Sequence, residues 1–363
     1  MSRRPNLPVA IMQQLNFIGP RALQWRDVPP PVLDDPKSVL VRPLTVSTCD
    51  MDGVVIQGLL PLKGPVPLGH EGEGVIIEAG GEVTRWRVGD RVIIPWKIAC
   101  GHCKSCGRGH SAQCLTVPPE DAYGWGPTAP HWGGFLSDVV LVPFADTMLT
   151  RLPDGIDPVL ACGVADNISD GWRAVGPALR ERPGGTVLVA GMVPPGSIGL
   201  YAAGIAVALG SERVVYADHD QRRLEIAGKM GAEPLQLGPN SLESLRLGGG
   251  LDGGFDVTVD ASGSPEILQS LIRLTARAGV CVSTAGIVYR GRDPQLPVYE
   301  MYRKSMTFST GWVHTHSLID DPLDLIASGR FDPRPVITRV VPWEEAHAAL
   351  AEPFTKLIVS REA

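Results

Sequence analysis

The pattern of apolar and polar positions divides the chain into two parts. Before residue 150, short β-rich runs such as residues 39–46 alternate with proline-rich connections, and residues 72–95 predict two strands joined by glycine turns. Helical periodicity is scarce there, so this part predicts an all-β, barrel-like domain. From about residue 158, helical and strand patterns alternate, which predicts a doubly wound parallel sheet.

Residues 186–218 are the clearest unit of the second part. A buried-strand pattern at 186–190 leads through a glycine-rich turn to an apolar helix at 200–209, and a strand at 213–217 ends at Asp218. This order predicts a βαβ unit whose turn holds a dinucleotide pyrophosphate at a helix N-terminus. The alternative is a tight turn without a ligand.

The glycines of this turn depart from the usual G-x-G-x-x-G spacing. Gly199 precedes Asp218 by 19 residues, close to the roughly 20 expected between the last glycine and the ribose-binding acid. We therefore interpret residues 193–195 as an insertion after the first glycine. Asp218 favours NAD over NADP, because a carboxylate accepts ribose hydroxyls and repels a 2′-phosphate. The predicted cofactor-binding residues are Gly191, Gly196, Ser197, Ile198, Gly199, Asp218 and Arg223.

The rest of the second part continues the alternation. The predicted helices cover residues 221–230, 265–277, 322–328 and 343–351. The predicted strands cover residues 255–260, 280–284, 335–341 and 356–359, and residues 248–254 are expected to be a loop.

Composition and charge indicate a two-domain globular protein and disfavour nucleic-acid-binding and membrane-spanning classes. At 363 residues, 44% hydrophobic and 20% charged, the chain predicts two domains with a large core. A net charge of −6 disfavours a nucleic-acid partner. No apolar stretch is long enough for a membrane span, and the N-terminus does not resemble a secretion signal, so we expect a cytoplasmic protein.

Four of the seven cysteines lie within fifteen residues, in the pattern C-x2-C-x2-C-x7-C. Four thiolates on one short loop can surround a tetrahedral zinc and leave no open position, which is typical of a structural site. Incidental thiols are disfavoured by the spacing, and a nucleic-acid-binding zinc knuckle by the acidic charge. The predicted ligands of this structural zinc are Cys100, Cys103, Cys106 and Cys114.

Cys49 in VSTCDMDG and His70 in PLGHEGEG would alone be ordinary core or surface residues. Together with the segment GHEGEGVIIEAG, the four-cysteine loop and a βαβ unit about 120 residues after His70, the chain resembles the zinc-containing medium-chain alcohol dehydrogenases over essentially its whole length. The resemblance implies a GroES-like β-barrel catalytic domain, residues 1–162 and 311–363, with a Rossmann domain inserted at residues 163–310. It also implies a catalytic zinc on Cys49 and His70, with Glu71 as a nearby carboxylate.

The third zinc ligand of this family is usually Cys or Glu. Aligning Gly171 and Trp172 with the family's glycine–aromatic pair places Asp166 at the ligand position and Cys162 one turn earlier, so we prefer Asp166. An aspartate ligand resembles certain formaldehyde dehydrogenases, although this chain is too short for their coenzyme-covering insertion. Asp52 resembles the family carboxylate that orients the zinc-bound histidine.

The resemblance implies two zinc ions per chain and hydride transfer between NAD and a small alcohol or polyol, or the matching aldehyde or ketone. Met51 and Val54 replace the family's proton-relay residues, so we expect either a water chain or Asp170 to carry the proton, or an unusual substrate. A structural, ion-paired Asp170 is equally compatible with the sequence. The family also implies a homodimer or homotetramer. Two alternatives remain open: a zinc-poor quinone or enoyl reductase of the same superfamily, and a non-catalytic member.

Overall fold

The computed structural model describes residues 11–59, 62–125, 129–191, 194–238, 242, 254–291 and 293–363. The chain divides into two compact units. The first unit is Met1–Leu152, Val341–Glu352 and Val359–Ala363, and the second is Pro153–Val340 and Pro353–Ile358. The predicted domain boundaries, at 162/163 and 310/311, mark a different division and stay a prediction.

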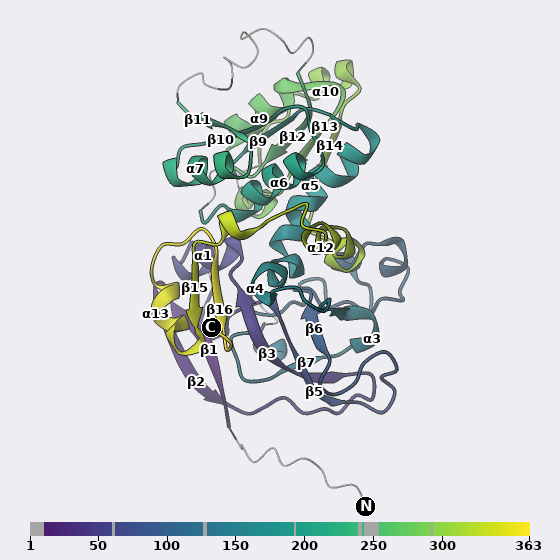
Figure 1. The fold of residues 1–363 in the computed structure, drawn as a ribbon, viewed down its shortest axis with the longest axis vertical. Coiled ribbons are helices and arrows are strands. Elements are labelled where there is room, and N and C mark those ends of the chain that lie inside the picture. The colour runs from purple at the N-terminus through teal and green to yellow at the C-terminus, as the bar shows by residue number, and fades with distance from the viewer. Residues whose placement is uncertain are drawn as a thin grey trace, which may run out of the picture. The chain divides into compact units, whose positions relative to one another are not determined.

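The first unit is built from antiparallel strands (Figure 1). A small sheet has the order β2-β1-β4, and in a larger one β3, β5, β6 and β8 are successive neighbours, with β7 also paired to β3. The bounds are β1 Met12–Gly19, β2 Ala22–Val28, β3 Val39–Ser47, β4 Val66–Pro67, β5 Glu71–Ala79, β6 Arg91–Ile94, β7 Val140–Val142 and β8 Thr150–Arg151. The predicted barrel-like β character of this part is therefore confirmed.

The pairing of β3 with β5 explains how two distant ligand candidates meet at one end of the sheet. The strands are antiparallel, and Ser47, the last residue of β3, faces Glu71, the first residue of β5. Cys49 follows the end of β3 and His70 directly precedes β5, so antiparallel pairing brings them to the same edge. The register shifts between Pro43 and Thr45, where proline lacks the N–H that a regular ladder needs.

Short helices interrupt the first unit, and the sequence pattern did not predict them. Their bounds are α1 Asp50–Ile56, η1 Cys106–Arg108, η2 Ser111–Gln113, α2 Ala129–Trp132 and α3 Ala145–Met148. The most important is α1, which begins directly after Cys49 with a capping box. The Cys49 side chain accepts a backbone N–H, and the Asp52 side chain accepts the N–H of Cys49.

The second unit is a six-stranded parallel sheet in the order β11-β10-β9-β12-β13-β14. The bounds are β9 Val187–Ala190, β10 Val214–Asp218, β11 Glu233–Gln236, β12 Phe255–Asp260, β13 Thr275–Ser283 and β14 Thr307–Thr310. The strand order reverses at β9, which pairs with both β10 and β12, and ligands bind at such a switch point in open α/β sheets. The predicted doubly wound parallel sheet is confirmed.

Helices cover both faces of this sheet: in Figure 1, α5 and α6 lie on one side and α9 and α10 on the other. The helices before β12 are α4 Pro158–Ala161, η3 Cys162–Ala165, α5 Asn167–Glu181, α6 Ser197–Ala208 and α7 Gln221–Lys229. Those after it are α9 Pro265–Leu274, η4 Gly286–Tyr289, α10 Val298–Lys304, α11 Thr315–Leu318 and α12 Asp320–Ala327. The C-terminal elements are η5 Arg334–Val336, β15 Arg339–Pro342, η6 Trp343–Glu345, α13 Ala346–Leu350 and β16 Leu357–Ser360.

Three predicted elements differ from the structure. The helix predicted to reach residue 277 ends at Leu274, because Thr275 begins β13 and its hydroxyl donates to the Leu271 carbonyl. The strand predicted at 335–341 begins instead as the proline-initiated turn of η5. The helix predicted at 343–351 is divided into η6 and α13. Except for Gly254, the predicted loop at 248–254 lies outside the described residues.

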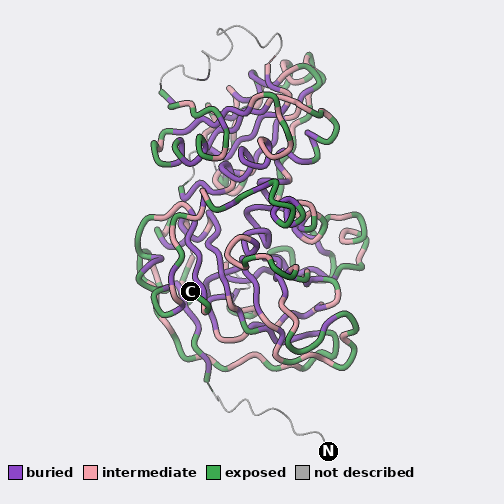
Figure 2. Tube along the Cα trace, in the orientation of Figure 1, coloured by how far each residue is buried: buried purple, intermediate pink, exposed green. Residues whose placement is uncertain are grey.

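The core follows the central strands, such as β9 and β12, whose traces in Figure 2 are largely buried, whereas the edge strands β2, β11 and β14 are mostly exposed or half-buried. All four residues of β9 and all five of β10 are buried, as expected for parallel strands covered on both faces. Across the described residues, no helix combines the length and apolar character needed to span a membrane.

Candidate functional site

The four cysteines of the 100–114 loop form one cluster in the first unit. Their sulfur atoms lie within 4.8 Å of one another, and the Cys103 and Cys114 sulfurs are 4.0 Å apart. Sulfur ligands at about 2.3 Å from zinc in a tetrahedron are separated by about 3.8 Å. The cluster therefore fits a zinc ion with only small adjustments.

Backbone and hydroxyl donors around the loop point at these sulfurs. The Cys103 N–H donates to the Cys100 sulfur at 3.3 Å, and the Thr116 hydroxyl donates to the same sulfur at 3.1 Å. The Leu115 N–H donates to the Cys103 sulfur at 3.3 Å. Such donors stabilise thiolates, which are the form that binds metal.

The ionisation of these thiols indicates that they need a cation. The N–H groups of Cys106 and Leu115 lower the pKa of the Cys103 thiol to about 6. Burial, followed by the neighbouring thiols of Cys103 and Cys114, raises the pKa of Cys106 above its usual range. Crowded sulfurs cannot all become thiolates without a positive charge among them, and a bound zinc ion would supply that charge.

The first unit also places Cys49 and His70, both buried, at the shared edge of β3 and β5. Cys49 is the N-cap of α1, and its sulfur accepts the Met51 N–H at 3.4 Å. This contact fixes the thiol at a helix N-terminus, where a negative charge is favoured. Glu71 begins β5 and is fully buried.

Asp52 connects the two ligand candidates of this unit. One carboxylate oxygen accepts the Cys49 N–H at 2.7 Å, and the other lies 3.8 Å from Nδ1 of His70. The second distance is longer than a hydrogen bond but short enough for an electrostatic interaction. Asp52 is thus beside Nδ1, which leaves Nε2 as the ring nitrogen for a metal.

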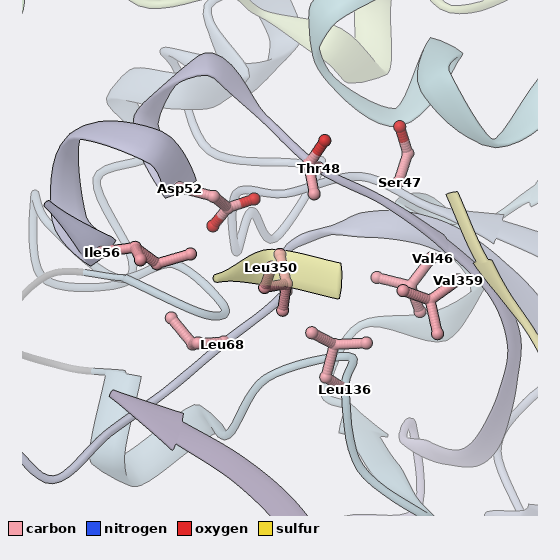
Figure 3. Close-up of a pocket in the computed structure, with 10 residues that line it drawn as sticks. Val46, Ser47, Thr48, Asp52, Ile56, Leu68, Leu136, Leu350 and Val359 are labelled. Carbon is pink, nitrogen blue, oxygen red and sulfur yellow. The ribbon is translucent and has the colours of Figure 1, made fainter. Parts of the chain in front are cut away.

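A small cavity adjoins Asp52 (Figure 3). Its walls are mostly apolar, and Figure 3 shows the Asp52 carboxylate at one side of the space. An apolar surrounding strengthens the interactions of this carboxylate, because water does not screen them. The lining residues are Val46, Ser47, Thr48, Asp52, Ile56, Leu68, Gly69, Leu136, Leu350 and Val359.

The predicted third ligand, Asp166, lies in the second unit as the N-cap residue of α5. It is buried, and one of its carboxylate oxygens accepts the Asn167 side-chain N–H at 3.2 Å. Cys162 begins η3, one turn earlier, and its thiol lies 3.6 Å from the Val159 carbonyl. Asp170 forms a 2.6 Å ion pair with Arg173, as expected of the structural alternative, and its role as a proton relay stays a prediction.

The predicted phosphate turn leads into α6. Gly196 is the N-cap residue of α6 and has a φ of 88°, a conformation that favours glycine. Ser197, Ile198 and Gly199 form the first turn of the helix, where backbone N–H groups have no helical acceptor. Within the proposed insertion, Val193 lies outside the described residues.

The predicted ribose acid, Asp218, ends β10 and is fully buried. Arg223 from α7 donates to both carboxylate oxygens, through Nε at 2.7 Å and Nη2 at 2.8 Å. Burial acts to raise the pKa of Asp218, but the hydrogen bonds from Arg223 and from the Asp220 N–H outweigh it and hold the pKa below its usual value. Asp218 is therefore an ionised, paired carboxylate.

Two known protein families match successive parts of the chain. The family described as "Alcohol dehydrogenase GroES-like domain" matches residues 35–154, and "Zinc-binding dehydrogenase" matches residues 197–328. A glutathione-independent formaldehyde dehydrogenase of Pseudomonas aeruginosa is 30% identical, covering 83% of this chain and 82% of its own. The chain belongs to the zinc-type medium-chain alcohol dehydrogenase family.

Two further proteins match nearly the whole length of this chain. A probable D-xylulose reductase A of Arthroderma otae is 28% identical over 94% of both chains. The alcohol dehydrogenase TADH from Thermus sp. ATN1 superposes with a TM-score of 0.85 at 27% identity, covering 96% of this chain and 99% of that one. The chain is thus an oxidoreductase of a zinc-binding family.

Sequence reasoning missed two residues of this alcohol dehydrogenase family member, Asn167 and Tyr216, that contact predicted site residues. Asn167 accepts hydrogen bonds from the Ser197 hydroxyl at 2.9 Å and from the buried Lys356 ammonium at 2.8 Å. It thereby joins α5, next to Asp166, to the first turn of α6. Tyr216 donates from its hydroxyl to Asp218 at 2.8 Å. Only Tyr216 had a sequence signal, because residues two apart in a strand share a face.

Proposed function

We propose that this chain is a zinc-dependent oxidoreductase that transfers hydride between a small alcohol or polyol, or the matching carbonyl compound, and NAD. We also propose two zinc ions per chain, one structural and one catalytic. The homodimeric or homotetrameric state and the cytoplasmic location stay predictions.

The observation that carries the proposal is a pair of buried metal donors outside the cysteine loop, Cys49 and His70, at one end of β3 and β5. They would supply a thiolate and an imidazole, and we propose that Asp166, which is also less than a tenth exposed, supplies a carboxylate as the third ligand. Three such protein ligands are typical of catalytic zinc, because they leave a fourth position for water or substrate. Four thiolates, as in the loop, leave none.

The residues around these donors support distinct roles. Asp52 is placed to keep the His70 ring oriented, and the N-cap position of Cys49 stabilises its thiolate. The first turn of α6 offers N–H groups to a pyrophosphate. Bound zinc would act as a Lewis acid on the substrate oxygen, and bound NAD would exchange hydride with the substrate carbon.

Zinc content and activity test the proposal together. We expect about two zinc ions per chain by inductively coupled plasma mass spectrometry, and NADH formation at 340 nm with members of an alcohol and polyol panel. Asp166→Ala is expected to retain about one zinc per chain and to lose activity. Cys162→Ala, one turn earlier in the chain, is the matched control and should keep two zinc ions per chain and full activity.

The reverse result would overturn the choice of ligand: full zinc and activity in Asp166→Ala, with both lost in Cys162→Ala. A wild-type protein with one zinc per chain would instead support a reductase without catalytic metal or a non-catalytic member. Activity on activated double bonds then separates these two alternatives.

A further inference from the structure

The Asp218 carboxylate already accepts as many hydrogen bonds as it can hold. One oxygen accepts from Arg223 Nη2 at 2.8 Å and from the Asp220 N–H at 2.9 Å. The other accepts from Arg223 Nε at 2.7 Å and from the Tyr216 hydroxyl at 2.8 Å. A carboxylate has about four lone-pair positions, so two ribose hydroxyls cannot be added unless existing donors leave.

Tyr216 reaches this carboxylate from within the same strand. Tyr216 and Asp218 are two residues apart in β10, so their side chains lie on one face of the sheet, and both are fully buried. The Tyr216 hydroxyl lies directly over Gly191, the first glycine of the turn, where a Cβ would collide with it. The same Cβ would also meet an oxygen of Asp218, so the phenol and the ribose acid lie together against the first glycine.

We infer that the Tyr216 hydroxyl is an internal substitute for a ribose hydroxyl on Asp218, and that it must give up this contact when the dinucleotide binds. Tyr216 is thus a residue that sets cofactor affinity. This inference rests on the proposed dinucleotide function.

Among the four donors, Tyr216 is the one that a ribose can displace most easily. The Asp220 N–H belongs to the backbone between β10 and α7. Arg223 holds both oxygens through a charged, bidentate fork, the stronger kind of hydrogen bond. The phenol is a neutral group that donates a single bond to this carboxylate, and a ribose hydroxyl offers the same donor chemistry.

Calorimetric titration of the zinc-loaded protein with NADH tests this role without measuring turnover. Tyr216→Phe keeps the ring and removes the hydroxyl, so we expect the Kd for NADH to fall about tenfold, equivalent to ~1.4 kcal/mol. The Kd for NADPH should change by less than about threefold, because its ribose carries a phosphate in place of one hydroxyl. If Tyr216→Phe does not fold, Tyr216→Leu carries the same expectation.

Tyr289→Phe is the matched control. Tyr289 also donates to a buried carboxylate, Asp260, at 2.8 Å in the same unit, and its loss should leave the Kd for NADH within about twofold. An unchanged or higher Kd in Tyr216→Phe, with NADH bound by the wild type, would overturn the inference alone. No binding of NADH or NADPH by the wild type or any variant would overturn the proposed function, and the inference with it.

Discussion

Arg223→Met tests how much the second unit depends on the buried pair at the end of β10. Arg223 and Asp218 are both less than a tenth exposed, and two hydrogen bonds join them. Methionine retains a long apolar side chain but removes the charge and both donors. The Asp218 carboxylate then keeps only the Tyr216 hydroxyl and the Asp220 N–H among these four contacts.

Removing one partner of a buried ion pair costs about 3–5 kcal/mol, because the remaining charge is left in a poorly solvating environment. Two donors remain on Asp218, so we expect the lower end, ~3 kcal/mol. Arg213→Met is the matched control. Arg213 pairs with Glu233 at 2.8 Å, but its side chain is 38% exposed and that of Glu233 is 56% exposed, so its loss should cost less than about 1 kcal/mol.

The difference between wild type and Arg223→Met should depend on pH. In the wild type the pKa of Asp218 is depressed, so its stabilising contribution is present above the unfolded pKa of about 3.9 and is lost as pH falls through the folded value. In the variant, Arg223 no longer offsets the effect of burial, so the pKa of Asp218 should rise. Protonation of Asp218 should then neutralise its unpaired charge. The loss of stability should therefore be largest near neutral pH and shrink toward pH 4.

Urea unfolding at pH 7.5, 6 and 4.5 measures this loss, and hydrogen exchange of peptides from β10 assigns the transition to the second unit. Adding Asp218→Asn to Arg223→Met removes the unpaired negative charge of Asp218 and should restore part of the stability at pH 7.5. The reasoning is refuted if Arg223→Met costs no more than Arg213→Met, or if its cost is the same at all three pH values.

Three further predictions follow from the described contacts. Cys106→Ser should remove about one zinc per chain by mass spectrometry and lower the Tm, whereas Cys281→Ser, a buried cysteine outside the zinc loop, should keep the metal. Gly191→Ala should cost about 1–3 kcal/mol by thermal unfolding, and adding Tyr216→Phe should recover part of it, since the phenol is one of the groups that the new Cβ meets. Asp170→Asn should leave the pH–rate profile unchanged because this acid is ion-paired; a shifted profile would restore the relay hypothesis.

The parallel sheet was predictable because its central strands are buried on both faces. The short length and β-branched residues of the apolar runs at β9 and β10 favour strands over helices, and the glycine turn between them indicates the order strand, helix, strand. The short elements were less predictable. Nothing in the periodicity indicates α1, which is seven residues long and exists because Cys49 and Asp52 form a capping box.

The zinc loop was predictable because all four ligands lie within fifteen residues. The contacts of Asn167 were not, because its partner Lys356 is 189 residues away and no local pattern links them. Nothing in the local sequence indicates that Lys356, which directly precedes the terminal strand β16, is buried. Long-range polar contacts of this kind depend on the finished packing of the second unit.

Tyr216 shows where a sequence fingerprint stops being informative. The spacing of Gly199 and Asp218 predicts the helix and the strand that follow a dinucleotide turn, and the structure has both as α6 and β10. Recognition of a ribose depends instead on how many acceptor positions the carboxylate has left, and side chains from β10 and α7 decide that. Cofactor affinity in this protein is then a competition between a phenol and a sugar for one carboxylate oxygen, so a single hydroxyl group can set it while the fingerprint stays unchanged.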